Sequence, residues 1–328
     1  MKKLLYNKTP VLVLIVLIIS IFLGAIYLNS ISDKEVNVQG DPNNENEFTY
    51  NDDGTVTLGS GMVANGFNDS ITNKIIDSGS LFKPVNGKIQ GQVSFKQNIS
   101  EKRNYLLIIM IDYKQHDFIV NDTTYSTFPF SLEGEDGLRI DVEIININSH
   151  AHEYNYFIIS EPDINELSID DSNEWIKLLM TSNFYWWRLL LSNSTKSINL
   201  SEYDESYIKM DSQMNYGIQL TKTHQEIIAM PSCTSMEDVE LVLSNTNDYD
   251  MEYMLVAFLD WEQIPIDDDD MTKFIKIPSQ TNIYLKMKIP YVEKDTPYQI
   301  FAIPKPYSND LKNAIPPSST LRTIITPK

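Results

Sequence analysis

The chain has 328 residues, and its 26 basic and 45 acidic side chains give a formal net charge of −19. Because like charges repel, this balance argues against nucleic acid and against anionic polymers as partners. The only cysteine, Cys233, excludes an intramolecular disulfide, and the length is enough for two ordinary domains.

An apolar segment at residues 9–32 predicts a transmembrane helix. It contains no charged side chain, and at about 1.5 Å per residue it can cross a bilayer core of about 30 Å. Lys2, Lys3 and Lys8 precede it, and basic flanks stay on the cytoplasmic side. We therefore expect a cytoplasmic tail at residues 1–8, a membrane anchor and an extracytoplasmic remainder.

The alternative for this segment is a signal peptide, cut after Ala25 or near Ser30, which would release a secreted protein. A signal peptide has a shorter apolar core, and it carries small residues at its cleavage site. The core here is long, and Leu23 stands where a cut after Ala25 needs a small residue. We favour the uncleaved signal-anchor.

Residues 33–54 are polar, with many Asn, Asp and Glu side chains. Such a composition cannot bury enough apolar surface to fold alone. We expect a flexible acidic tether that separates the folded part from the membrane.

An internal repeat follows the tether. The segments NYLLIIMIDYKQ (104–115) and EYMLVAFLDWEQ (252–263) align without a gap and share Tyr, Asp and Gln. Segments before and after them match in the same order, including Tyr156 with Tyr298. The period of about 145 residues is too long for a solenoid. It predicts two copies of one domain, at residues 55–165 and 205–328.

Each copy has the pattern of a β domain. Residues 89–95 and 138–144 alternate apolar and polar side chains, which is typical of strands with one buried face. Leu106–Ile111 is continuously apolar, as in a strand buried on both faces. The predicted fold class is mainly β: a transmembrane helix followed by two homologous antiparallel β-sandwich domains of immunoglobulin-like architecture. We expect Asp112 and Asp260 to end their strands and cap the following turns.

The stretch between the copies, residues 166–204, is the predicted connecting segment. A capping pattern predicts a short helix near residues 173–180. Residues 183–191 are apolar apart from Arg188, and their aromatic content favours a strand. This strand could be the last of the first copy or the first of the second copy.

The connecting segment also holds the candidate binding residues Tyr185, Trp186, Trp187 and Arg188. These residue types are enriched at interface hot spots, and aromatic rings stack on sugars. The favoured alternative is that they pack in the core. Adjacent side chains of a strand point to opposite faces, so one Trp is exposed or is covered by the neighbouring domain. The second case would place it at the joint between domains.

No catalytic residues are predicted. His150 and His152 could face one way on an extended chain, but nothing at metal-site spacing supplies a third ligand. Cys233 and His224 lie near each other in sequence without the pattern of an activated nucleophile.

The acidic run Asp267, Asp268, Asp269 and Asp270 is the candidate calcium site, since Ca²⁺ prefers oxygen ligands. The favoured alternative is a solvated hairpin tip, because runs of carboxylates usually face water. No other cofactor is predicted.

The sequence thus favours a membrane-anchored, extracytoplasmic, non-catalytic binding or scaffold protein at the cell surface. Its expected partners are the membrane, through the N-terminal helix, and a surface protein or carbohydrate. One alternative is a membrane-anchored hydrolase of wall or sugar polymers, with an acid pair in a cleft between the domains. Another is an accessory subunit of a membrane assembly.

Overall fold

A computed structural model describes residues 49–50, 56–57, 63–70, 74–164, 183–191, 203–204, 206–210, 215–266, 270–308 and 315–328. The predicted transmembrane segment 9–32, most of the tether and the helix near 173–180 lie outside these residues. Within the described ranges there is no helix, and so none that could span a membrane. The chain divides into two compact units, Met1–Gly59 and Ser60–Lys328. The first contains a small antiparallel pair, β1 (Thr49–Tyr50) and β2 (Val56–Thr57).

The unit Ser60–Lys328 is built from sheets that are mostly antiparallel, as the sequence predicts for a mainly β fold of the β-sandwich kind. We call residues 63–191 the first half and residues 206–328 the second half. Each half has an outer sheet and an inner sheet, with a hydrophobic core between them.

The outer sheet of the first half has the order β4-β3-β5-β11-β8-β9. Its strands are β3 (Val63–Asp69), β4 (Ile75–Ile76), β5 (Ile89–Gln97), β8 (Phe118–Val120), β9 (Thr123–Tyr125) and β11 (Gly137–Ile144). The inner sheet has the order β10-β6-β12-β13, with β7 also paired to β6. Its strands are β6 (Arg103–Ile111), β7 (Lys114–Gln115), β10 (Thr127–Leu132), β12 (Glu153–Ser160) and β13 (Phe184–Leu190).

The outer sheet of the second half has the order β14-β21-β17-β15. Its strands are β14 (Ile208–Met210), β15 (Ile218–Thr221), β17 (Asp238–Asn245) and β21 (Thr281–Lys288). The inner sheet has the order β16-β24-β22-β18-β19, with β20 on β18 and β23 on β22. Its strands are β16 (Ser232–Thr234), β18 (Met251–Leu259), β19 (Glu262–Ile264), β20 (Lys273–Ile277), β22 (Thr296–Pro304), β23 (Ser318–Ser319) and β24 (Thr323–Thr326).

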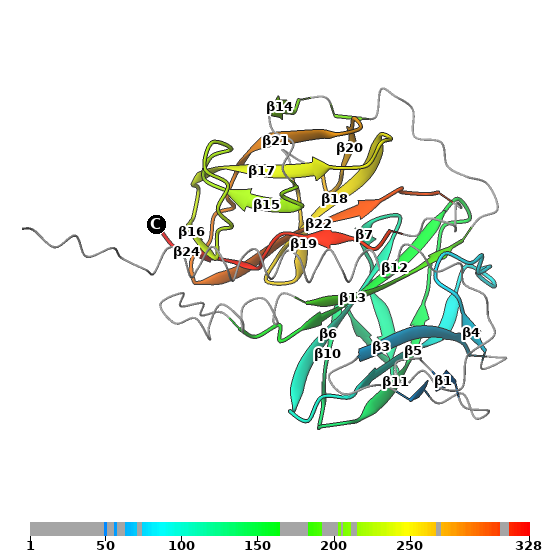
Figure 1. Cartoon of the computed structure of the whole chain (residues 1–328). Helices are drawn as coiled ribbons and strands as arrows, with labels where there is room; N and C mark the ends of the chain where they lie inside the picture. Colours follow the sequence, from blue (N-terminus) through cyan, green and yellow to red (C-terminus); the bar gives the residue numbers. More distant parts are fainter. Residues whose placement is uncertain are drawn as a thin grey trace, which may run out of the picture. The chain divides into compact units, whose positions relative to one another are not determined.

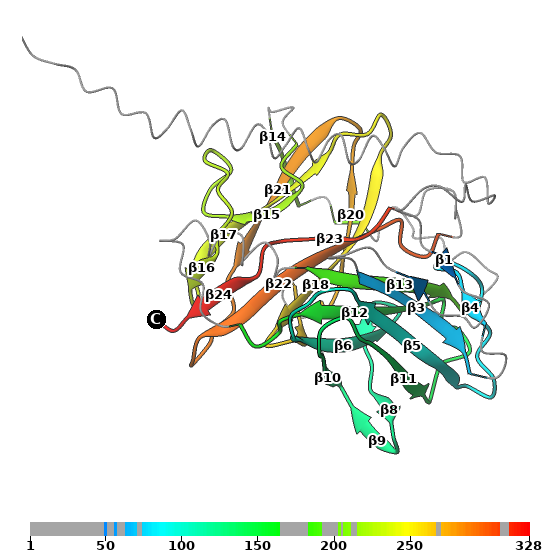
Figure 2. The same cartoon turned by 60° about the horizontal axis from the view of Figure 1, so that its bottom comes forward.

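The two inner sheets pack against each other through a third hydrophobic core, which we call the joint. Figure 1 shows β18 and β22 beside β12 and β13, and Figure 2 shows the same neighbours after rotation. The joint takes side chains from both halves, among them Ile108, Phe157, Val256 and Phe301. A central inner strand such as β6 therefore faces a core on each side and must be apolar at successive positions, which explains the unbroken run at 106–111.

The pairing registers of the two halves correspond strand by strand. Val93 pairs with Ile140 in the first half, and Leu241 pairs with Leu285 in the second, as the repeat predicts. Buried amides also correspond: Gln97 donates to the carbonyls of Glu101 and Leu132, and its counterpart Asn245 donates to those of Tyr249 and Ile277.

One segment of the repeat alignment is corrected by the structure. Ile111 pairs with Tyr154 and the equivalent Leu259 pairs with Tyr298, so Tyr298 corresponds to Tyr154 and not to Tyr156. The error is a shift of two residues. A shift of two keeps every side chain on its original face, so the apolar pattern alone could not detect it.

The aspartates of the repeat end their strands as predicted. Asp112 and Tyr113 have φ of 48° and 64°, and Asp260 and Trp261 have 49° and 66°. Two successive left-handed residues are typical of the tight turns that join hairpin strands. The predicted capping is corrected for Asp112, whose Oδ1 accepts hydrogen bonds from the amides of His152 and Glu153, outside its own turn.

The glutamines of the repeat meet each other across the joint. The amide nitrogen of Gln115 donates to Oε1 of Gln263 at 2.7 Å, and the amide nitrogen of Gln263 donates to Oε1 of Gln115 at 2.6 Å. Their side-chain nitrogens donate to the carbonyls of Trp261 and Tyr113. This reciprocal contact relates the two halves by a local two-fold arrangement.

The reciprocal pair leads to a stability prediction. Replacing Gln263 by Ala leaves the amide of Gln115 without its acceptor, and it should lower the free energy of unfolding by about 1–3 kcal/mol. In a double-mutant cycle with Gln115→Ala, measured by denaturant titration, the two losses should not add. The exposed Gln225 provides a control, since Gln225→Ala should change stability little. Additive losses would contradict a direct coupling between Gln115 and Gln263.

Candidate functional site

The candidate binding residues lie on β13, which pairs with β12 and forms an edge of the first inner sheet. Their side chains alternate between two cores. Tyr185 and Trp187 pack against the core of the first half, and Trp186 packs against the joint. Of the two alternatives for the adjacent tryptophans, the structure supports the one in which the second half covers one of them.

Both indole nitrogens on β13 have partners. Nε1 of Trp186 donates to Oδ1 of Asn155 at 2.9 Å, and Nε1 of Trp187 donates to the carbonyl of Ile76 at 3.1 Å. Tyr185 makes an edge contact with Phe95 at a centroid distance of 5.1 Å. These aromatic side chains are half-buried and engaged in packing, so a ligand role for them stays a prediction.

Arg188 forms a buried ion pair at the joint. Its Nη2 lies 2.9 Å from Oε2 of Glu153 and donates to the carbonyl of Ser308 at 2.6 Å. Glu153 is fully buried and Arg188 nearly so. Since Glu153 and Arg188 belong to the first half and Ser308 to the second, the charge pair links the two halves.

Three further groups donate to the Glu153 carboxylate. Tyr113 Oη lies 2.6 Å from Oε1, Asn155 Nδ2 lies 3.0 Å from Oε1, and the amide of Tyr307 lies 2.8 Å from Oε2. Burial raises the pKa of Glu153, and Arg188 and these hydrogen bonds oppose that rise. Burial, together with the Glu153 carboxylate, also raises the pKa of Tyr113 well above its ordinary value. Both oxygens of the Glu153 carboxylate therefore have partners, whereas Nε of Arg188 is buried without one. The cluster links the two halves at the joint.

Sequence reasoning missed this network. Glu153 lies next to His152 in sequence, and no local pattern connects it to Arg188. His150 is exposed and the ring of His152 packs 5.9 Å from that of Tyr307. Across the described ranges, no three metal-ligating side chains come together.

Of the candidate calcium residues, Asp267, Asp268 and Asp269 lie outside the described residues. Asp270 is exposed, and its carbonyl accepts a hydrogen bond from the amide of Ile266 at 2.9 Å. Calcium binding by this run therefore stays a prediction.

Cys233 lies in β16 and its side chain is buried in the core of the second half. Burial raises the pKa of its thiol to about 12, and the neighbouring Glu237 adds to the effect. The thiolate, which is the nucleophilic form, is therefore scarce at neutral pH.

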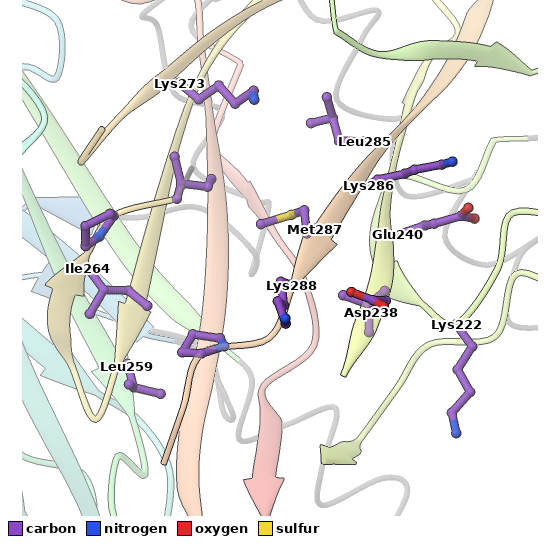
Figure 3. A pocket seen from close by; sticks show the side chains of 14 residues that line it. Lys222, Asp238, Glu240, Leu259, Ile264, Lys273, Leu285, Lys286, Met287 and Lys288 are labelled. Carbon is purple, nitrogen blue, oxygen red and sulfur yellow. The ribbon is translucent and has the colours of Figure 1, made fainter. Parts of the chain in front are cut away.

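An open cleft of about 870 Å³ lies in the second half, between the end of β19 and the strands β17 and β21. Figure 3 shows Ile264 and Leu259 on one side and Met287 and Leu285 on the other. Its apolar lining is formed by Val239, Leu259, Ile264, Pro265, Ile266, Leu285, Met287 and Pro290. Its charged lining is formed by Lys222, Asp238, Glu240, Lys273, Lys286 and Lys288.

Three of the six charged residues that line the cleft have identified partners. Lys273 pairs with Asp204, and Lys222 pairs with Glu237 at 3.2 Å. Oε2 of Glu240 lies 2.9 Å from Nδ1 of His224. Lys286 and Lys288 are exposed and form no ion pair within the part of the chain that the structure describes. In the pairing register they stand opposite Glu240 and Asp238 of β17.

No protein family model matches this sequence, and no curated protein matches it either. Among solved structures, the chaperone DraB from E. coli shares 8% identity, with 82% of this chain and 98% of that chain covered and a TM-score of 0.26. The secreted serine protease VesC from Vibrio cholerae shares 9%, with 64% and 45% covered and a TM-score of 0.20. A red sea bream transglutaminase shares 7%, with 81% and 31% covered and a TM-score of 0.21. At such scores these likenesses carry no argument about function.

Removing the cation of the buried ion pair should greatly lower the stability of the folded chain. Arg188→Met leaves the Glu153 carboxylate buried without its counter-charge and should lower the free energy of unfolding by about 3–5 kcal/mol. The double variant Glu153→Gln with Arg188→Met should lose less than this. The exposed ion pair between Lys88 and Glu143 is the control, and Lys88→Met should have a much smaller effect.

The loss in Arg188→Met should also depend on pH. Without Arg188 the folded-state pKa of Glu153 lies further above its unfolded value, so the carboxyl contributes stability that is lost as pH rises through the folded pKa. Denaturant titrations at about pH 5 and pH 7 should show the smaller deficit at the lower pH. An equal loss of unfolding free energy at both pH values would contradict the burial of a charged Glu153.

Because its thiol is buried, Cys233 should react slowly with a thiol reagent. In the native chain at about pH 8, most of the thiol stays protonated and covered, so labelling should follow unfolding of the second half. Labelling rates measured across a urea titration should rise with the fraction unfolded. Rapid labelling without denaturant would show that Cys233 is accessible.

Proposed function

We propose that this chain is a membrane-anchored, extracytoplasmic, non-catalytic binding or scaffold protein that acts at the cell surface. The observation that carries the proposal is the joint, which unites two β-sandwich-like halves through a shared core, a reciprocal glutamine pair and the hydrogen bonds that a buried ion pair of the first half makes to the second. A body held together in this way presents its surfaces at one fixed spacing, which suits a scaffold or a receptor.

We further propose that the two halves are homologous domains of immunoglobulin-like architecture that arose by duplication. What supports this is the shared register, the equivalent buried amides of Gln97 and Asn245, and the matched turns at Asp112 and Asp260. Chance resemblance between apolar strands would not reproduce polar contacts at corresponding positions.

The location rests on the sequence of the N-terminal region. Lysines followed by the uncharged segment 9–32 favour an anchor with a cytoplasmic N-terminus. A tether at 33–54 would then hold the folded unit away from the bilayer, where it could meet a surface protein or a carbohydrate. The net negative charge favours partners that are not anionic polymers.

The hydrolase alternative has one supporting observation. Asp238 and Glu240 are two residues apart on β17, so they share a face, and both line the cleft. Each stands opposite a lysine in the pairing register, with Asp238 facing Lys288 and Glu240 facing Lys286. An arrangement of alternating charges suits strand pairing better than a general acid and base, so we keep the binding function as the proposal.

The proposal predicts exposure on the outside of intact cells. Protease added to cells should digest the folded unit, while a tag fused before Met1 should stay protected and membrane-associated. A tag after Lys328 should be lost on the same treatment. The control is the same chain in permeabilised cells, where both tags should be digested.

Three results would contradict the proposal. Full protection of the C-terminal tag would reverse the topology. Recovery of the chain in the medium with a new N-terminus after Ala25 or near Ser30 would support the secreted alternative. Release of sugars from purified wall polymer, abolished by Asp238→Asn with Glu240→Gln, would support the hydrolase.

A further inference from the structure

Asparagine stands directly before glycine at two positions of this chain, Asn65-Gly66 and Asn86-Gly87. Such a pair is prone to spontaneous deamidation, because glycine has no Cβ to shield its amide nitrogen or to restrict its backbone. The glycine nitrogen can then attack the side-chain carbonyl carbon of the asparagine. The two pairs lie in different surroundings within the first half, and these surroundings decide where the reaction can occur.

Asn86-Gly87 forms the tip of a tight hairpin that precedes β5. The amide of Val85 donates to the carbonyl of Lys88 at 2.9 Å, and the amide of Lys88 donates to the carbonyl of Val85 at 3.0 Å. Asn86 and Gly87 have φ of 53° and 71°. Positive φ at both central residues is typical of the two-residue turns that asparagine and glycine favour.

The reacting groups of this tip are accessible. Asn86 is exposed, and its side chain has no hydrogen-bond partner in the part of the chain that the structure describes. Within the same residues the amide of Gly87 donates to no acceptor, while its carbonyl accepts from the amide of Ile147 at 2.9 Å. Local opening of these few backbone hydrogen bonds therefore lets the Asn86-Gly87 peptide rotate into the geometry of attack.

Asn65-Gly66 is held in place by the sheet and by the core. Asn65 and Gly66 lie within β3 and pair with Phe95 and Ser94 of β5, the neighbouring strand in Figure 2. Nδ2 of Asn65 donates to Oη of Tyr156 and to the carbonyl of Trp186, both at 3.1 Å. Attack at Asn65 requires the loss of these hydrogen bonds and a rearrangement of β3. The same dipeptide thus provides a control within the same molecule.

We propose that Asn86 is a site of spontaneous deamidation, which converts it into aspartate and isoaspartate, and that the fold protects Asn65. The backbone nitrogen of Gly87 bonds to Cγ of Asn86, and the bond from Cγ to Nδ2 breaks. Nδ2 leaves as ammonia with the proton of the Gly87 amide, and a succinimide ring remains. Water then opens the ring. Cleavage at Cγ gives aspartate, cleavage at the main-chain carbonyl carbon gives isoaspartate, and no oxidant or reductant takes part.

The two products change the hairpin tip in different ways. Aspartate adds a negative charge beside Lys88, whose Nζ lies 2.7 Å from Oε1 of Glu143. Aspartate tolerates positive φ, so this product retains the turn. Isoaspartate lengthens the main chain by a methylene group, which does not fit a two-residue turn. We expect it to break the cross-turn hydrogen bonds of Val85 and Lys88 and to leave both cores intact.

The test ages the full unmodified chain in detergent at mildly alkaline pH, beside a sample unfolded in urea. Peptide mapping by mass spectrometry gives the fraction converted at Asn65 and at Asn86, and fragmentation distinguishes isoaspartate from aspartate. Freshly prepared Asn86→Asp is the matched variant, since it carries the new charge on a main chain of normal length. Hydrogen exchange compares the aged chain with this variant at residues 85–88.

In the folded chain, Asn86 should convert at least about tenfold faster than Asn65, because a hairpin tip opens far more often than a paired strand. In urea the two rates should become similar, since both pairs then have the same local chemistry. Exchange at Val85 and Lys88 should be faster in the aged chain than in Asn86→Asp.

Similar rates at Asn65 and Asn86 in the folded chain would overturn the proposal. So would an unchanged Asn86 in the folded chain when the unfolded sample converts. Equal exchange in the aged chain and in Asn86→Asp would contradict the expected effect of isoaspartate on the turn. The reaction needs neither a membrane nor a partner, so these outcomes leave the proposed function untouched.

Discussion

Burial of the inner sheets on both faces is the constraint on which the unit Ser60–Lys328 depends. The central inner strands β6, β12, β18 and β22 send alternate side chains to their own core and to the joint. In β6, Leu107 lies in the core of the first half and Ile108 lies in the joint. A half taken alone would expose the joint face, a broad apolar surface of the kind that soluble monomers avoid. The two halves are thus stable partners chiefly because neither can cover this face by itself.

Polar contacts give the joint its register. The reciprocal glutamines, and the hydrogen bonds of Arg188 to Ser308 and of Tyr307 to Glu153, form only when the inner sheets meet in one orientation. Apolar packing alone tolerates small shifts, whereas an unpaired buried charge does not. The aromatic strand β13 contributes to both kinds of contact, since Trp186 packs in the joint and Arg188 carries the charge.

Much of the sheet structure was predictable from the sequence, because alternation of apolar residues reports which face is buried. It located β5 and β11 and correctly indicated that 106–111 is buried on both faces. It could not fix the match of Tyr298, since a shift of two residues preserves the pattern. It also gave no sign of the network at Glu153, whose partners lie far apart in sequence, or of the cleft beside β17 and β21.

The mutual contact of Gln115 and Gln263 is the geometry of an isologous dimer interface, in which the same surface patch serves both sides. In a true homodimer any substitution appears twice, so both protomers must change together. Here the two sides are encoded separately. Each side can therefore change alone. Among the described residues the first half carries the hairpin β8–β9 on β11, while the second half carries β14 on β21, so a symmetric framework supports two different sheet edges.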